Sequence, residues 1–124
     1  MKPVISIVDD DDLVRECTID LFKSMGFAAV AFACAADFLN SDHVHGTSCL
    51  IADVQMPGMT GPELHHHLVQ AGRPIPTILI TAYPDDRDRA RALRSGVVGY
   101  LTKPFENGDL LACVRAALGP GEPH

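Results

Sequence analysis

Short apolar runs alternate with longer segments of mixed polarity along almost the whole chain, and this alternation limits the fold more than any other feature. The runs are too short for helices and are bounded by turn residues, so they predict buried strands at 4–8, 27–32, 49–53, 76–80 and 97–101. The segments that follow them predict helices at 12–25, 35–39, 61–71, 85–95 and 106–118. Five strand–helix pairs in strict alternation indicate a single α/β domain with a parallel sheet and right-handed crossovers.

The spacing of apolar residues predicts which side chains of three helices are buried. Residues three and four positions apart share one face of a helix. We expect inward-facing side chains at Leu13, Val14, Cys17, Leu21 and Met25, at Leu64, Leu68 and Val69, and at Leu110, Leu111, Val114 and Leu118. Three glycines, Gly26, Gly72 and Gly96, are expected to end helices, and the polar segment 41–48 is expected to be a loop.

The composition excludes several classes of function. The chain is acidic, with a formal net charge of −6, which argues against direct contact with nucleic acid because such a surface needs clustered Lys and Arg. No apolar run approaches the roughly 20 residues of a membrane span, and we expect neither a signal peptide nor a membrane anchor. The four cysteines form no C-x-x-C pair and have apolar neighbours, which favours reduced core residues in a cytoplasmic protein over a zinc site. They are Cys17, Cys34, Cys49 and Cys113.

Polar side chains stand where four of the predicted strands end. They are Asp9 and Asp10, Asp53, Thr81, and Lys103. Because the carboxyl ends of parallel strands lie at one edge of a sheet, where open α/β sheets bind ligands, we expect these residues to share one pocket. Clustered carboxylates repel one another unless a hard cation such as Mg²⁺ neutralises them. A lysine and a hydroxyl nearby would suit a phosphoryl group, with one aspartate as the candidate nucleophile.

Several other polar segments have simpler interpretations. Consecutive histidines at 65–67 point about 100° apart on a helix and cannot converge on one ion, so they indicate a solvated face. The arginines at 87, 91 and 94 indicate a wet helix face more than a partner surface, and Tyr100 could simply pack in the core. The acidic run at 9–12 could by itself be only a helix start.

Four segments together resemble the receiver domains of response regulators, the CheY-like family, and are most similar to FixJ-type receivers. The segments are Val8-Asp9-Asp10, the stretch from Asp53 through Met56-Pro57-Gly58 to Gly61, Thr81-Ala82, and Lys103-Pro104-Phe105. The resemblance extends from residue 4 to residue 118. It implies a doubly wound, flavodoxin/CheY-like sheet of five parallel strands in the order 2-1-3-4-5 with five helices. The receiver domain would occupy 1–118, and 119–124 would be a flexible tail or the start of a linker.

The resemblance implies an acceptor and a metal site. Asp53 would be the phosphorylated residue. Asp9 and Asp10 would be the acidic pair that holds Mg²⁺, or Mn²⁺ in its place, with Asp53 and the backbone carbonyl of Gln55 as further ligands.

The resemblance also implies a switch. Thr81 and Lys103 would contact the phosphoryl group, and Thr81 and Tyr100 would move together, Tyr100 turning inward. The Lys103–Pro104 peptide bond would be cis.

The function implied is that of a phosphorylated signalling switch and not of an enzyme that acts on small molecules. Its partner would be a sensor histidine kinase or a phosphotransfer protein, and a self-dimer could form through the fourth helix, fifth strand and fifth helix. The alternative is a Mg²⁺-dependent phosphatase of the haloacid dehalogenase type, which also uses a strand-end aspartate. That class needs a second acid two residues later, where this chain has Gln55.

Overall fold

The structure is a computed structural model that describes residues 3–119. It contains one five-stranded parallel sheet in the order β2-β1-β3-β4-β5. The strands are β1 (Val4–Val8), β2 (Ala28–Phe32), β3 (Cys49–Asp53), β4 (Thr77–Thr81) and β5 (Gly99–Thr102). The predicted fold class and strand order are therefore confirmed. The prediction that 119–124 form a flexible tail falls almost wholly on residues outside those described.

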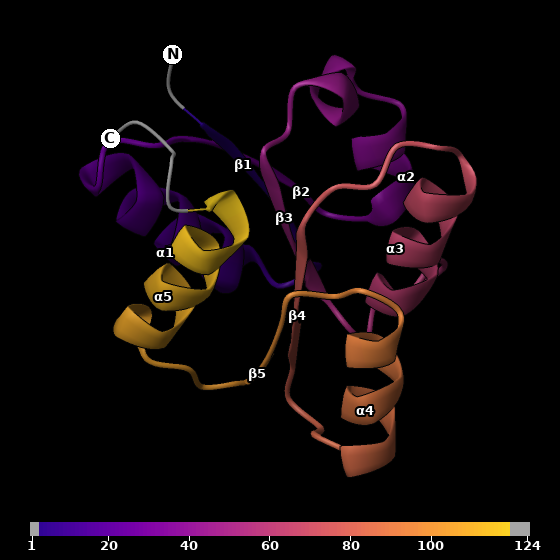
Figure 1. Cartoon of the computed structure of the whole chain (residues 1–124). Coiled ribbons are helices and arrows are strands. Elements are labelled where there is room, and N and C mark those ends of the chain that lie inside the picture. The colour runs from indigo at the N-terminus through magenta and orange to yellow at the C-terminus, as the bar shows by residue number, and fades with distance from the viewer. Residues whose placement is uncertain (1–2, 120–124) are drawn as a thin grey trace.

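Two layers of helices cover the sheet. The helices are α1 (Asp12–Ser24), α2 (Ala35–Leu39), α3 (Gly61–Gln70), α4 (Asp86–Arg94) and α5 (Asn107–Leu118), with a short 3-10 helix, η1 (Asp42–His45). Helices α1 and α5 cover one face of the sheet, and α2, α3 and α4 cover the other (Figure 1). The segment 41–48, predicted as a loop, therefore contains η1. Ser41 caps this helix by accepting a hydrogen bond from the His43 amide. Across residues 3–119, no helix combines the length and the hydropathy that crossing a membrane requires.

Helix ends follow from local chemistry. The Asp11 side chain accepts hydrogen bonds from the first amides of α1, and Thr60 and Glu63 form a capping box at the start of α3. Gly26, Gly72 and Gly96 have φ values of 90°, 74° and 101°. L-residues with side chains rarely adopt such angles, so these glycines end α1, α3 and α4 as predicted.

The core lies on both faces of the sheet, and β3 is buried along its whole length. Successive strand residues point to opposite faces, so Leu50 and Ala52 face α2, α3 and α4 while Ile51 faces α1 and α5. This burial on both sides explains why β3 reads as a continuous apolar run up to Asp53.

Two predicted helical faces are partly wrong. In α1 the fully buried side chains are Thr18 and Phe22, whereas Leu13 is 67% exposed and Met25 44% exposed. Thr18 and Phe22 lie four positions apart and therefore share one face of the helix. This face packs against the sheet although it includes a polar residue. In α3, Val69 is 42% exposed because it lies about 100° around the helix from the buried Leu68.

Two polar or thiol predictions also need correction. Cys17 is exposed on α1 and is not a core residue, and Cys34 and Cys113 are only half-buried. Cys49 is buried as predicted, and burial raises the pKa of its thiol to about 12. His65 is not on a solvated face, since only 6% of it is exposed. Burial, and then the nearby His66, lower the pKa of His65.

Candidate functional site

The strand register brings the predicted polar residues to one edge of the sheet. Val8 of β1 pairs with Ala52 of β3, so Asp9 and Asp53 leave the sheet side by side. Strand β4 pairs with β3 up to Asp53 and with β5 at Thr81, which puts Thr81 and Lys103 at the same edge. Strand order also reverses beside β1, where open α/β sheets form their ligand crevice.

Three carboxylates meet at this edge. One oxygen each from Asp9, Asp10 and Asp53 lie within 4.8 Å of one another. Asp9 and Asp53 are buried and Asp10 is exposed, so the cluster opens to solvent on the Asp10 side. Hard oxygen donors at this spacing fit a divalent cation such as Mg²⁺, which keeps part of its water shell.

Lys103 connects two of these carboxylates. Its Nζ atom lies 3.0 Å from Oδ2 of Asp9 and 3.2 Å from Oδ2 of Asp53. Oδ2 of Asp9 is buried and, among the described residues, has no hydrogen bond of good geometry, so its interaction with the ammonium is ionic. Burial by itself lowers the pKa of Lys103, but the nearby carboxylates of Asp9 and Asp53 outweigh this effect and raise that pKa.

Asp53 is held in an unfavourable environment for a charged group. Burial, and then the negative charge of Asp9, raise the pKa of its carboxyl above the ordinary value. The charge of Lys103 and the Gln55 amide, which donates a hydrogen bond to Asp53 Oδ1 at 3.2 Å, oppose this without cancelling it. A cation bound at the cluster would offset this unfavourable negative charge, so the environment of Asp53 favours cation binding.

Thr81 sits at the end of β4 with its hydroxyl engaged on both sides. The hydroxyl donates a hydrogen bond to Oε1 of Gln55 at 2.7 Å and accepts one from the Tyr83 amide at 3.0 Å. Gln55 therefore contacts Asp53 through its backbone and Thr81 through its side chain. The Gln55 carbonyl, the predicted metal ligand, takes part in none of these contacts.

Tyr100 of β5 packs inward in the core cluster that includes Ala92 of α4 and Val97. Its hydroxyl is buried and has no hydrogen-bond partner of good geometry within residues 3–119. Burial raises the pKa of Tyr100, and the nearby carboxylate of Asp88 adds to the effect. The peptide bond between Lys103 and Pro104 is cis.

Two contacts at the site were not predicted from the sequence. Arg15 of α1 donates a hydrogen bond to the Asp9 carbonyl at 2.7 Å and forms an ion pair with Asp12, so it braces the acidic loop. The i,i+3 spacing of Asp12 and Arg15 was the available signal. Gly61, at the start of α3, lies against the backbone of Asp53, and no sequence pattern marks that contact.

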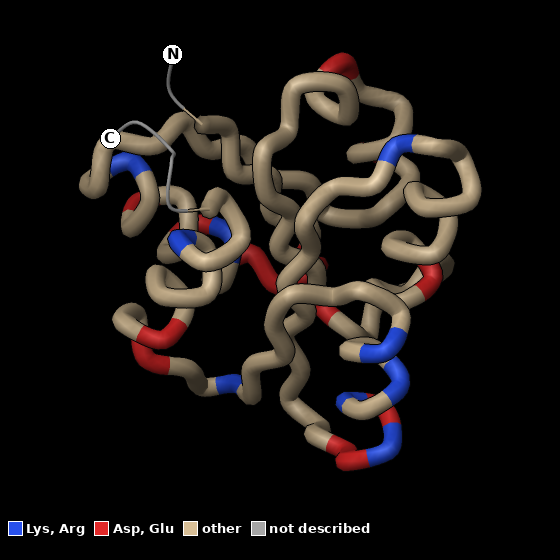
Figure 2. The backbone as a smooth tube through the Cα atoms, viewed as in Figure 1, with Lys and Arg blue, Asp and Glu red and all other residues tan. Residues whose placement is uncertain are grey.

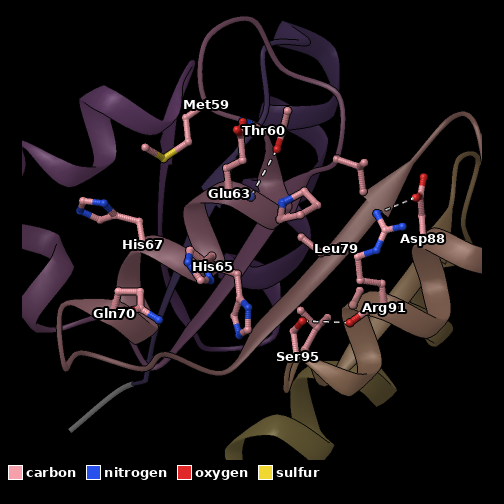
Figure 3. A pocket seen from close by; sticks show the side chains of 15 residues that line it. Met59, Thr60, Glu63, His65, His67, Gln70, Leu79, Asp88, Arg91 and Ser95 are labelled. Carbon is pink, nitrogen blue, oxygen red and sulfur yellow. Dashed lines mark hydrogen bonds and ion pairs between the residues drawn. The ribbon is translucent and has the colours of Figure 1, made fainter.

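A separate groove lies between α3 and α4 (Figure 3). It has a volume of about 740 Å³, and its lining includes Val54, Leu79 and Ala92. Asp88 and Arg91 of α4 form an ion pair at its rim, while His67 points away from α4. Ala92 is the only buried side chain of α4, so this helix is held to the sheet by little apolar contact.

Charge is unevenly distributed over the molecule. Four of the ten basic residues fall on α4, at 87, 89, 91 and 94, and the blue segments gather along that helix in Figure 2. Asp85 caps α4, and Asp86 and Asp88 lie in its first turn, as suits the helix dipole. The predicted basic face of α4 is thus present and solvated.

Comparison with known proteins gives a consistent result. The model of the family described as "Response regulator receiver domain" matches residues 5–115. The response regulator protein TodT of Pseudomonas putida is 39% identical over 115 residues, which cover 93% of this chain and 51% of TodT. The transcriptional regulatory protein FixJ of Azorhizobium caulinodans is 36% identical over 115 residues, covering 93% of this chain and 54% of FixJ.

A solved structure agrees with these sequence relatives. The response regulator StyR superposes with a TM-score of 0.87 at 39% identity, covering 95% of this chain and 60% of StyR. The chain spans about half the length of the curated relatives it matches. None of these comparisons supports the haloacid dehalogenase-type alternative. The carboxylate cluster, the sheet order and the family match agree, and the chain belongs to the receiver-domain family of two-component response regulators.

Proposed function

We propose that Asp53 is the phosphoacceptor of this receiver domain. The observation that carries the proposal is the environment of Asp53, which contacts Lys103 at 3.2 Å and lies within 4.8 Å of the carboxylates of Asp9 and Asp10. Receiver domains interact with histidine kinases and phosphotransfer proteins, so the donor would be a phosphohistidine on such a partner. The phosphorylated state of Asp53 would then control an output partner or domain. The chain would catalyse only its own phosphorylation and dephosphorylation.

In the proposed reaction an Asp53 carboxylate oxygen attacks phosphorus while the P–N bond to the donor imidazole breaks. The imidazole nitrogen leaves with the electron pair of that bond. Mg²⁺, or Mn²⁺ in its place, held by Asp9, Asp10, Asp53 and the Gln55 carbonyl, would neutralise charge on the carboxylates and on the transferred group. Lys103 holds the acceptor in place and offers its ammonium to the incoming phosphoryl oxygens.

We propose that the modified state is read through α4, β5 and α5. The phosphoryl group adds a charge of about −1.5 to −2 beside Lys103 and Thr81. A shift of Thr81 toward it would change the packing between Tyr100 and α4, a two-state population shift. The groove beside α4 and the single buried side chain of that helix support this, because both mean that α4 makes little apolar contact with the rest of the domain.

Partners and location follow from the same proposal. The face formed by α4, β5 and α5 would carry a self-dimer, with the arginines of α4 at its edge. The four free cysteines suit a reducing compartment, and we propose a cytoplasmic location.

Phosphate incorporation tests the proposal. Acetyl phosphate, or a phosphorylated sensor kinase, should label the wild type in the presence of Mg²⁺, and Asp53→Asn should remove the label. Asp37→Asn, at an exposed position of α2, is the matched control and should label normally. Normal labelling of Asp53→Asn would show that Asp53 is not the acceptor.

Dimer formation has its own test. Beryllofluoride, a phosphoryl mimic, is added with Mg²⁺, and sedimentation velocity should then detect a larger species. A sedimentation coefficient that stays unchanged although beryllofluoride is bound would refute the dimer but not the phosphoacceptor.

A further inference from the structure

We propose that the side chain of Gln55 is a latch that holds the Thr81 hydroxyl and competes with the phosphoryl group for its single proton. This inference rests on the proposed function of Asp53. It assigns Gln55 a positioning role that is separate from any contact its backbone makes with a metal.

The Thr81 hydroxyl has a limited capacity for hydrogen bonds. A threonine hydroxyl has one proton to donate. In this structure that proton goes to Oε1 of Gln55, at 2.7 Å, and the hydroxyl oxygen accepts from the Tyr83 amide at 3.0 Å. Phosphoryl oxygens only accept hydrogen bonds, so Thr81 can bind one only by releasing Gln55.

Gln55 lies between the acceptor Asp53 and the switch residue Thr81. Its amide donates to Asp53 Oδ1 at 3.2 Å, while its side chain receives the Thr81 hydroxyl. One residue therefore links the end of β3 to the end of β4. A group added to Asp53 would therefore stand beside the residue that holds the Thr81 hydroxyl.

Release of Gln55 is possible without disturbing the core. Gln55 is exposed, and beside it lies an open hollow of about 530 Å³ lined also by Val54, Met56, Pro57 and Thr60. A freed Gln55 side chain has space there and can be solvated. The cost of opening the latch is therefore close to the net value of one hydrogen bond.

The experiment measures the affinity of the Mg²⁺-loaded chain for beryllofluoride in four proteins: the wild type, Gln55→Met, Thr81→Ala and the double variant. Methionine has a similar length but no strong acceptor. Gln55→Met should bind beryllofluoride about twofold to tenfold more tightly, the range for losing one competing hydrogen bond. In the Thr81→Ala background the same substitution should have no effect, because the hydroxyl it would release is gone.

Controls separate the latch from other effects. Gln70→Met, at an exposed position of α3, should leave the affinity unchanged. If Gln55→Met folds poorly, Gln55→Ala can replace it, because alanine also lacks the side-chain oxygen that accepts the Thr81 hydrogen bond. The Thr81 methyl resonance gives a second readout, and Gln55→Met should shift it in the absence of beryllofluoride, which a change in water access would not do.

The outcomes are distinguishable. Unchanged or weaker binding by both Gln55 variants, or the same gain in the Thr81→Ala background, would overturn the latch while leaving the phosphoacceptor intact. A wild type that fails to bind beryllofluoride with Mg²⁺ would overturn the proposed function and the latch with it.

Discussion

Gly61 lies directly against the backbone carbonyl of Asp53. A Cβ atom at position 61 would overlap the carbonyl oxygen of Asp53 and lie 3.0 Å from both its carbonyl carbon and Cδ2 of Leu79. The start of α3 therefore packs directly on the end of β3, and this close approach requires a residue without a side chain at position 61.

Replacing Gly61 with alanine should therefore damage both stability and the site. We expect Gly61→Ala to lower the free energy of unfolding by about 1–3 kcal/mol, because backbone atoms must move to admit the methyl group. Urea unfolding measures the stability and a Mg²⁺ titration measures the site. Gly108→Ala in α5 is the matched control: its Cβ meets nothing within 4 Å, and alanine should stabilise the protein by about 0.4–1 kcal/mol. Equal stability of the two variants would contradict the proposed contact.

Neutralising Asp53 should stabilise the protein without metal. Burial and the charge of Asp9 raise the pKa of Asp53, so the folded state favours the neutral carboxyl more than the unfolded state does. At pH 7 the ionised group is a cost to folding, and Asp53→Asn should raise the midpoint of thermal unfolding in EDTA. Mg²⁺ should stabilise the wild type more than this variant. A midpoint in EDTA that falls would show that the ion pair with Lys103 outweighs burial and repulsion.

Removing Lys103 should leave two buried carboxylates without a counter-charge. We expect Lys103→Met to cost about 3 kcal/mol of unfolding free energy, at the low end of the range for breaking a buried ion pair because the ammonium is partly exposed. Added Mg²⁺ should recover part of this loss in thermal melts. Lys23→Met, at an exposed position near the end of α1, should change stability by less than about 0.5 kcal/mol.

The buried His65 predicts how stability varies with pH. Burial, and then His66, lower its pKa from the ordinary 6.5. Above about pH 6.5 the residue is neutral in both states, and its contribution to stability is complete and constant. As pH falls below 6.5 the unfolded state takes up the proton first, so the free energy of unfolding decreases, by at most about 1.4 kcal/mol per pH unit, until the folded-state pKa is passed.

Replacement of His65 tests that pH dependence. Denaturant unfolding between pH 7 and 5 should show a shallower fall for His65→Leu than for the wild type. His67→Gln, at an exposed position of α3, should keep the wild-type slope. Parallel curves for wild type and His65→Leu would mean that other groups cause the acid sensitivity.

The strand ends were predictable because each combines two local signals. A short apolar run followed by Asp53 and the Pro57-Gly58 turn indicates a strand that ends at Asp53. In a parallel sheet the carboxyl ends of the strands lie at one edge. The same reasoning assembled Asp9, Thr81 and Lys103 around Asp53. The register of the sheet shows that these four residues lie at the same edge.

The helical faces were less predictable because apolarity is only one reason for burial. Thr18 is small enough to lie under α1 although it is polar, while Leu13 and Met25 extend along the surface. His65 is buried because it shares a face with Gly61 and Leu68, despite its neighbours in the histidine run.

The bond between Thr81 and Gln55 lay beyond prediction for a different reason. Both residues were recognised as part of the site, but the bond depends on side-chain rotamers at the ends of two adjacent strands. Sequence periodicity specifies which face a residue occupies and not which of its neighbours it contacts.

Because Ala92 is the only side chain that α4 buries, the surface of this helix and the stability of the domain are nearly independent. Exchange of its exposed residues would alter what the helix can recognise while leaving the core unchanged. A new partner could therefore be acquired by substitutions at the eight exposed positions of α4, with Ala92 and its packing against the core kept.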